Sequence, residues 1–297
     1  MWLPMILVSA FCWSWVNVLD SAIVRQHEKH PLVLLWFQSL FTVPTLFILL
    51  FFVDVHTTWW PLLVLGGLVT YLGDIFFFLI LDRVDASISN AAWSILAIFL
   101  SIIGFIFFHE SWSLQQFLGA VLILGAVFFL TFWHSHILSF KTLLLLIAFS
   151  LFYLPTHVLR KAALLDSQQI GAVFFWLLIG RELLSFAGAL IVPSLRKRTF
   201  QLFRRAPPHF FIGSGLVIVA FFFGEYFGTL AYNYGPVSLV SIVANSQLFL
   251  VMFFAWLCYK LAPKFAPKEL LDTHTVRIKL LSICLMFSGL ALLAVSQ

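Results

Sequence analysis

The sequence predicts an all-α integral membrane protein of ten transmembrane helices, arranged as two inverted repeats of five helices. Three observations predict this fold class: the composition, ten long apolar segments and an internal repeat. Apolar residues make up 62% of the 297 residues and charged residues only 10%, whereas soluble domains have about 45–50% and about 25%. Too few polar side chains remain to cover a soluble fold, so lipid is the expected outer solvent.

Ten segments are long and apolar enough to cross a bilayer, which takes roughly 20 mostly apolar residues. The apolar runs do not alternate with polar residues, which favours helices over barrel strands. Most connections are short, and 194–208 and 260–276 are the two longer loops. The expected helices cover 2–22, 31–53, 59–81, 86–108, 113–133, 139–159, 169–193, 209–232, 236–258 and 277–295.

The positions of the basic residues predict an orientation. Almost all of the 17 Lys and Arg residues lie in the connections after the odd-numbered segments, whereas only Arg160 and Lys161 fall in connections on the other side. Because cytoplasmic loops are enriched in Lys and Arg, both termini are expected to face away from the cytoplasm. Basic residues that are spread over short loops, not gathered in one patch, also argue against a nucleic-acid partner.

An internal repeat relates the third and fourth segments to the eighth and ninth at one constant offset. We divide the chain into a first repeat, 1–137, and a second, 138–297. Each repeat has an odd number of helices, so the second enters the membrane from the opposite side. Such inverted repeats enclose a site near the midplane of transporters and give it alternating access. Gly73-Asp74 matches Gly224-Glu225, and Ser87, Asn90 and Ser94 match Ser238, Ser241 and Asn245.

Several short motifs carry a family resemblance. They are Trp13 to Asn17 in the first segment, Ala86-Ser87, Glu110 in a tight loop, and Gln116, Gly119 and Gly125 in the fifth segment. With these motifs the chain resembles EamA-type members of the drug/metabolite transporter superfamily over essentially its whole length. The resemblance implies a transporter of small metabolites, amino acids, drugs or activated sugars.

The resemblance also has departures. Arg181 is similar to an Arg of the family's seventh helix, but Gln38 stands about where an Arg is expected in the second. The second half has Tyr259-Lys260 and a basic loop in place of the Glu-containing turn. Members of this family usually have both termini in the cytoplasm, which is opposite to the orientation that the basic residues predict.

Ionisable residues inside the predicted helices are the main functional candidates, because a charge at the bilayer centre costs about 2.5–3.5 kcal/mol. Asp74 and Glu225 occupy matching places in the two repeats and could carry a proton or bind a cation. The alternative is that these buried acids only fix helix packing. Tyr71 lies one turn before Asp74 and is placed to hold it. Arg181 and Glu182 point about 100° apart, so Arg181 needs Glu225, Asp74 or a substrate anion as its partner.

Other polar and aromatic side chains are expected to line the same cavity. Asp20 shares a helix face with Trp13, but its place near the helix end leaves an interfacial, solvated role open. Pro155 in the sixth segment frees backbone carbonyls to face a cavity, and the nearby His157 is either a proton relay or a satisfied buried histidine. The expected substrate-binding residues are Trp13, Asn17, Tyr71, Asn90, Trp93, Tyr153, His157, Arg181, Asn245 and Gln247, with Asp74 and Glu225 as proton-coupling residues.

These features predict a secondary transporter that moves an amino acid-like, amine or drug-like solute across a cell membrane by alternating access, with proton coupling as an option. The alternatives are a lipid-carrier or nucleotide-sugar translocator and a membrane-embedded enzyme. We expect no enzyme, cofactor or metal, because His109-Glu110 lacks the second His of a zinc-protease motif and no reactive cluster is evident. The expected partners are a small-molecule substrate and the lipid bilayer, in a monomer or homodimer of a bacterial inner membrane.

Overall fold

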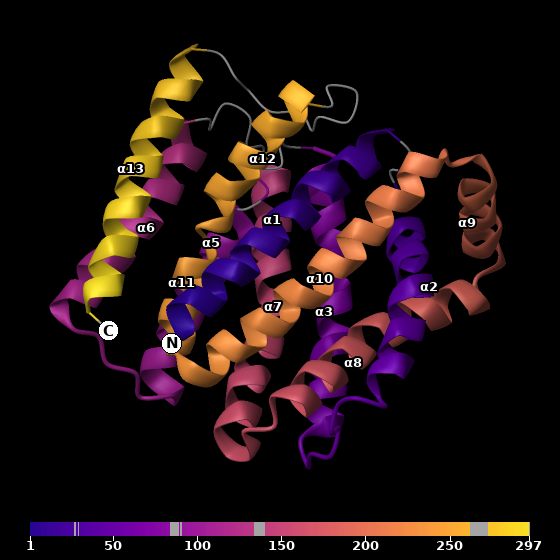
Figure 1. Ribbon diagram of the computed structural model, residues 1–297, viewed down its shortest axis with the longest axis horizontal. Helices are drawn as coiled ribbons and strands as arrows, with labels where there is room; N and C mark the ends of the chain where they lie inside the picture. Colours follow the sequence, from indigo (N-terminus) through magenta and orange to yellow (C-terminus); the bar gives the residue numbers. More distant parts are fainter. Residues whose placement is uncertain are drawn as a thin grey trace.

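The computed structural model describes residues 1–26, 28, 30–83, 89, 91–133, 140–261 and 273–296, which form helices and short connections without a strand (Figure 1). In chain order the helices are α1 (Trp2–Gln26), α2 (Pro31–Leu49), α3 (Trp60–Leu81), α5 (Ala91–Phe107), α6 (Leu114–Trp133), α7 (Phe140–Ser167), α8 (Ile170–Ile191), α9 (Pro193–Arg205), α10 (Pro208–Tyr234), α11 (Val237–Ala244), α12 (Gln247–Leu261) and α13 (Thr273–Val295).

Seven apolar stretches of the described chain are long enough to cross a membrane. They are Trp2–Val24, Pro31–Leu49, Trp60–Leu81, Phe140–Ser167, Ile170–Gly188, Phe210–Tyr234 and Val237–Leu261. Three further apolar helices, Ala92–Phe107, Leu114–Phe129 and Leu280–Val295, are shorter. The chain is therefore an all-helical, multi-pass membrane protein, as its composition predicts.

The sixth expected segment ends later than the sequence suggested. We expected it to end at 159, with Arg160 and Lys161 in a loop, but α7 continues to Ser167 and buries both side chains. Both charges have partners inside the bundle, which is why the helix tolerates them. The ammonium of Lys161 donates to the carbonyls of Tyr232 and Gly235 at 2.9 and 2.8 Å, where the end of α10 leaves carbonyls without intrahelical donors.

Two further expectations on helix boundaries are corrected. The expected helix 236–258 is interrupted at Asn245 and Ser246, between α11 and α12. The expected loop 194–208 contains the amphipathic helix α9, whose Thr199 and Leu202 are buried while Phe200 and Phe203 are exposed. Hydrophobicity alone predicts neither a helix break at polar residues nor a basic helix at the surface.

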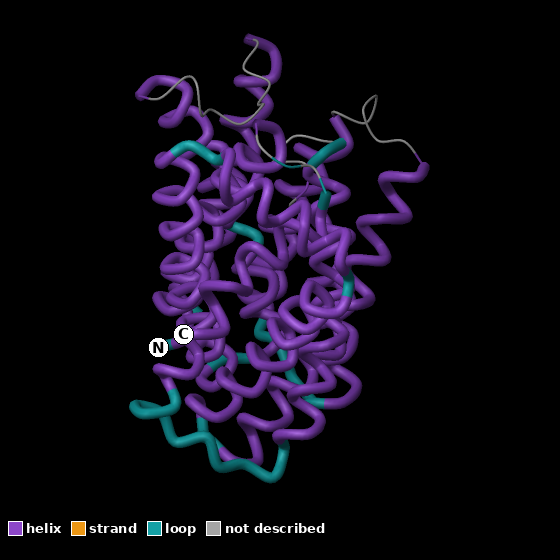
Figure 2. The backbone as a smooth tube through the Cα atoms, turned by 90° about the vertical axis from the view of Figure 1, so that its right-hand side faces the viewer, coloured by secondary structure: helices purple, strands orange, loops and turns teal. Residues whose placement is uncertain are grey.

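The two ends of the bundle differ in charge. We call the end where α1 finishes and α2 begins, at 26–31, the basic face, and the end where α2 finishes and α3 begins, at 49–60, the opposite face. With Arg160 and Lys161 inside α7, the connections on the opposite face contain no Lys or Arg; they are 49–60, 107–114, 167–170 and 234–237. Both termini lie close together (Figures 1 and 2).

Helix pairs from distant parts of the chain form the bundle. α1 packs along α10, α3 packs along both α7 and α8, and α5 packs against α11. α6 and α13 form a pair at one side of the bundle, and α9 lies at the other (Figure 1). The central helices are therefore α1, α3, α7, α8 and α10, and they carry the buried charges described below.

The crossing of α3 and α8 depends on two glycines. A Cβ at Gly180 would lie 2.2 Å from the carbonyl oxygen of Val64, and a Cβ at Gly67 would lie 2.2 Å from the carbonyl oxygen of Leu177. Small residues let helix backbones approach closely in membranes, where van der Waals contact holds helices together. These glycines therefore bring the α3 and α8 backbones into direct contact.

We expect Gly180→Ala to lower the thermal unfolding midpoint of the purified protein, because the added methyl group meets backbone atoms. Overpacking of this kind costs about 1–3 kcal/mol. Gly188→Ala is the matched control on the same helix, since its added Cβ has nothing within 4 Å, and it should leave the midpoint unchanged. Equal midpoints for the two variants would contradict the close crossing.

Candidate functional site

Within the described part of the chain, two ion pairs lie inside the bundle, each joining an acid to an arginine of another helix. Nε of Arg181 on α8 lies 2.5 Å from Oδ2 of Asp74 on α3. A terminal guanidinium nitrogen (Nη2) of Arg160 on α7 lies 2.5 Å from Oε2 of Glu225 on α10. The four side chains are between 3% and 14% exposed. Of the anions that the sequence left open for Arg181, Asp74 is its partner, because Glu225 is taken by Arg160.

Asp74 has a second partner from α7. The hydroxyl of Tyr153 donates to Oδ1 of Asp74. Tyr71, which we expected to hold Asp74, is not among the described residues that hydrogen-bond it; this expectation is wrong. The carboxylate turns toward the facing helices α7 and α8, so a side chain one turn earlier on α3 does not reach it.

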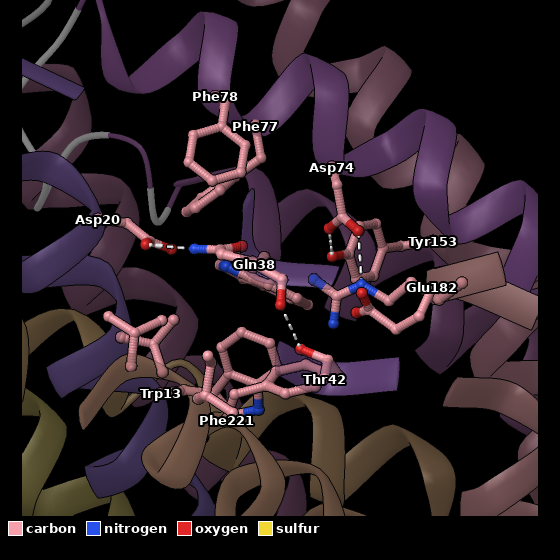
Figure 3. A pocket seen from close by; sticks show the side chains of 15 residues that line it. Trp13, Asp20, Gln38, Thr42, Asp74, Phe77, Phe78, Tyr153, Glu182 and Phe221 are labelled. Atoms are coloured by element: carbon pink, nitrogen blue, oxygen red, sulfur yellow. Dashed lines mark hydrogen bonds and ion pairs between the residues drawn. The ribbon is translucent and has the colours of Figure 1, made fainter. Parts of the chain in front are cut away.

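A first cavity lies next to Asp74, toward the basic face. It is enclosed by residues near the basic-face ends of their helices, including Asp20 on α1, Gln38 on α2 and Val217 on α10. In Figure 3 its polar side chains lie between Phe77 and Phe78 on one side and Phe221 on the other. The full lining is Trp13, Val16, Asp20, Gln38, Thr42, Asp74, Phe77, Phe78, Trp93, Tyr153, Arg181, Glu182, Val217, Ile218 and Phe221.

Asp20 belongs to this cavity and not to the membrane interface. The residue is only 4% exposed, and its carboxylate accepts a hydrogen bond of 2.9 Å from the side-chain amide of Gln38 (Figure 3). The interfacial, solvated role that the sequence left open for Asp20 is therefore excluded. One turn later on α2, the Thr42 hydroxyl donates to the backbone carbonyl of Gln38 at 3.0 Å and also lines the cavity.

A second cavity lies next to Glu225, toward the opposite face. Its lining includes Ile6 and Ser9 near the start of α1 and Tyr232 near the end of α10. A small hollow between Thr70, Tyr153, His157 and Arg181 borders both ion pairs, because Arg160 and Glu225 also line it. The second cavity is lined by Ile6, Ser9, Ala10, Trp13, Trp93, Leu96, Leu100, His157, Arg160, Gly224, Glu225, Gly228, Tyr232, Ser241, Ala244 and Gln247.

An aromatic layer separates the two cavities. Trp13 and Trp93 line both of them, and their ring centroids are 6.2 Å apart. Trp93 also meets the rings of Tyr153 at 5.0 Å and His157 at 6.4 Å. The two cavities are thus stacked along the bundle, with one ion pair in each and aromatic rings between them.

The expected site residues fall into three groups. Trp13, Asp74, Trp93, Tyr153, His157, Arg181, Glu225 and Gln247 line these cavities. Asn17 and Asn245 are buried, but like Tyr71 they do not line these cavities; Asn245 instead accepts a hydrogen bond of 2.6 Å from the hydroxyl of Ser94. Asn90 and Ser87 lie outside the described residues.

Sequence reasoning missed several residues that line the cavities, chiefly Arg160, Glu182, Thr42 and Phe221. For Arg160 a signal was available, because it follows Tyr153 by seven positions and therefore shares its helix face. Glu182 was noted only as the neighbour of Arg181. Thr42 and Phe221 carry no signal, since nothing distinguishes them from other residues of apolar helices.

Glu110, one of the motif residues, joins two helices. Its carboxylate accepts hydrogen bonds from the backbone nitrogens of Val237 at 2.5 Å and Ser238 at 3.1 Å, and from the Ser238 hydroxyl. These nitrogens begin α11, where backbone donors lack intrahelical acceptors and an anion is favourable. Glu110 therefore ties the connection between α5 and α6 to the start of α11, outside both cavities.

Residues 1–132 match the profile of the EamA-like transporter family, so the resemblance drawn from the motifs is confirmed over these residues. A solved structure, described only as the crystal structure of a protein, has 15% sequence identity to this chain and a TM-score of 0.65. The alignment covers 99% of this chain and 96% of that chain, and at this identity the similarity concerns the fold alone. No curated protein sequence matches the chain.

Proposed function

From the match of residues 1–132 to the EamA-like transporter family, we propose that this protein is a secondary transporter of small solutes that works by alternating access. The observation that carries the proposal is the pair of stacked cavities, each with a buried ion pair, at the centre of an apolar helical bundle. Charges inside a membrane protein are costly and are usually found where a solute or ion passes.

The contacts support two inverted repeats of five helices as the origin of the cavities. The hydroxyl of Ser94 donates to Asn245, which is 151 residues later, and this separation is the offset of the sequence repeat. Equivalent residues meet in this way at a two-fold axis. The packing of α3 on α7 has its counterpart in the packing of α10 on α1, as the repeat requires.

This arrangement supports a mechanism of alternating access. The first cavity lies toward the basic face and the second toward the opposite face, and the layer of Trp13 and Trp93 separates them. Rocking of one repeat against the other would open one cavity while it closes the other. We propose that the basic face is cytoplasmic, in a bacterial cell membrane, and that one chain suffices because it contains both cavities.

We further propose that Asp74 and Glu225 couple transport to protons. Each carboxylate is buried against an arginine, and protonation would release the arginine from its partner. Such an exchange of partners links a proton to a change in helix packing. The charged linings favour a water-soluble solute over a lipid carrier, and the alternative of an enzyme has no support from the cavity residues.

The proposal is tested with purified protein reconstituted into liposomes. Uptake of radiolabelled amino acids, primary amines and nucleotide sugars is measured with and without a pH gradient, against protein-free liposomes. We expect uptake of at least one class, stimulated by the gradient. Absence of uptake for every class under both conditions, with protein that is monodisperse and folded, would contradict the proposal.

A further inference from the structure

We infer that the first cavity binds an organic cation, namely a primary or quaternary ammonium compound with an apolar body. The inference rests on the proposed transporter function and adds the charge of its substrate. Three features of the cavity carry it: an excess of carboxylates, one carboxylate without a hydrogen-bonding partner, and walls of aromatic rings.

The first cavity contains more acidic than basic side chains. Asp20, Asp74 and Glu182 line it together with Arg181, its sole guanidinium or ammonium group. Arg181 is already paired with Asp74 at 2.5 Å, so these two charges compensate each other. Asp20 and Glu182 form no ion pair with the other residues that line the cavity, although the positive charge of Arg181 also acts on both.

Glu182 is the residue that points to a ligand. It is only 7% exposed and lines the first cavity (Figure 3), yet no donor within the described part of the chain hydrogen-bonds its carboxylate. Asp20, by comparison, has the amide of Gln38 at 2.9 Å. The Glu182 carboxylate faces the cavity, where a bound ammonium group would supply a hydrogen-bond donor and an opposite charge.

The aromatic walls suit an organic cation better than a metal ion. Trp13, Phe77, Phe78, Trp93 and Phe221 surround the acids, and ring faces attract ammonium groups while they cover apolar carbon. Among the described residues no group of His, Cys, Asp and Glu could hold a metal ion. The cavity thus combines carboxyl groups with apolar surface.

Arg181 does not oppose this assignment. Its guanidinium is 4.6 Å from the centroid of the Phe221 ring and 6.0 Å from that of Trp13, and Asp74 neutralises it. An anionic solute would have to displace Asp74 from Arg181 and then face Asp20 and Glu182. The electrostatics of the cavity therefore select against a carboxylate or phosphate.

The test compares two probes of similar size and opposite charge. Binding of 2-phenylethylamine and of 3-phenylpropionate to the purified full-length protein is measured by isothermal titration calorimetry at pH 8, with benzyltrimethylammonium as a second cation. We expect both cations to bind and the anion not to bind. If the anion binds and neither cation does, or if none of the three binds, the inference is overturned. In either case, uptake of a neutral or anionic solute in the liposome screen would leave the transporter proposal standing.

Glu182→Gln locates the site. We expect it to weaken cation binding by roughly tenfold or more, because it removes a charged acceptor while it keeps the shape of the side chain. Asp166→Asn is the matched control: Asp166 is an exposed acid that accepts a hydrogen bond from Trp59, far from the cavity lining, and its loss should not change cation binding. Unchanged affinity in folded Glu182→Gln would contradict the assignment to the first cavity, and the wild-type probe comparison stands even if that variant does not fold.

Discussion

Replacing Asp74 with Asn is expected to reduce solute uptake by reconstituted protein at least about 100-fold and to lower its thermal unfolding midpoint. The substitution leaves the guanidinium of Arg181 buried without its anion and weakens the acceptor of the Tyr153 hydroxyl. Removing one partner of a buried ion pair costs about 3–5 kcal/mol, mostly because an uncompensated charge remains.

A second variant separates transport from stability. Asp74→Asn combined with Arg181→Gln removes both charges and should restore much of the thermal stability, because no isolated charge is left. We expect uptake to stay low in this double variant, since the proposed role of Asp74 needs an ionisable group. Wild-type uptake by the double variant would mean that the Asp74–Arg181 pair is purely structural.

The largest effect on coupling is expected from Asp74→Asn and Glu225→Gln together. Without either ionisable carboxyl group, an imposed pH gradient should no longer drive accumulation of the solute. Downhill exchange of solute across the liposome membrane is the accompanying measurement, because it reports whether the cavities still open. Accumulation that still follows the pH gradient in this variant would rule out coupling through these two acids.

Much of the fold follows from hydrophobicity alone. Long apolar segments separated by short connections predicted the membrane helices, because spanning a bilayer requires that length and that composition. The errors lie where polar residues sit inside helices. Arg160 and Lys161 looked like loop residues, and only their partners on α10, namely Glu225 and the carbonyls of Tyr232 and Gly235, explain how α7 buries them.

The candidate site was predictable in part. A buried charge is conspicuous in an apolar helix, so Asp74, Glu225 and Arg181 could be selected from the sequence. Which acid meets which arginine depends on how the helices cross, and that is set by close contacts such as the one between Gly67 and the backbone of α8. The role of Glu182 could not be predicted for the same reason. It is a candidate substrate-binding residue because no described residue hydrogen-bonds its carboxylate.

Transport through this bundle requires water to reach both cavities, which cysteine accessibility measures directly. In a background without Cys12, Cys258 and Cys284, single cysteines replace Thr42 in the first cavity and Ser241 in the second. Ala126→Cys on α6 is the control, since Ala126 is fully buried and lines neither cavity. The proteoliposomes are treated on each side with a membrane-impermeant thiol reagent.

We expect the cysteine at position 42 to react when the reagent is on the basic-face side, the cysteine at position 241 to react when it is on the opposite side, and the cysteine at position 126 to react from neither. Rates at positions 42 and 241 no higher than at position 126, from both sides, would show a dry bundle and contradict the proposed transport path.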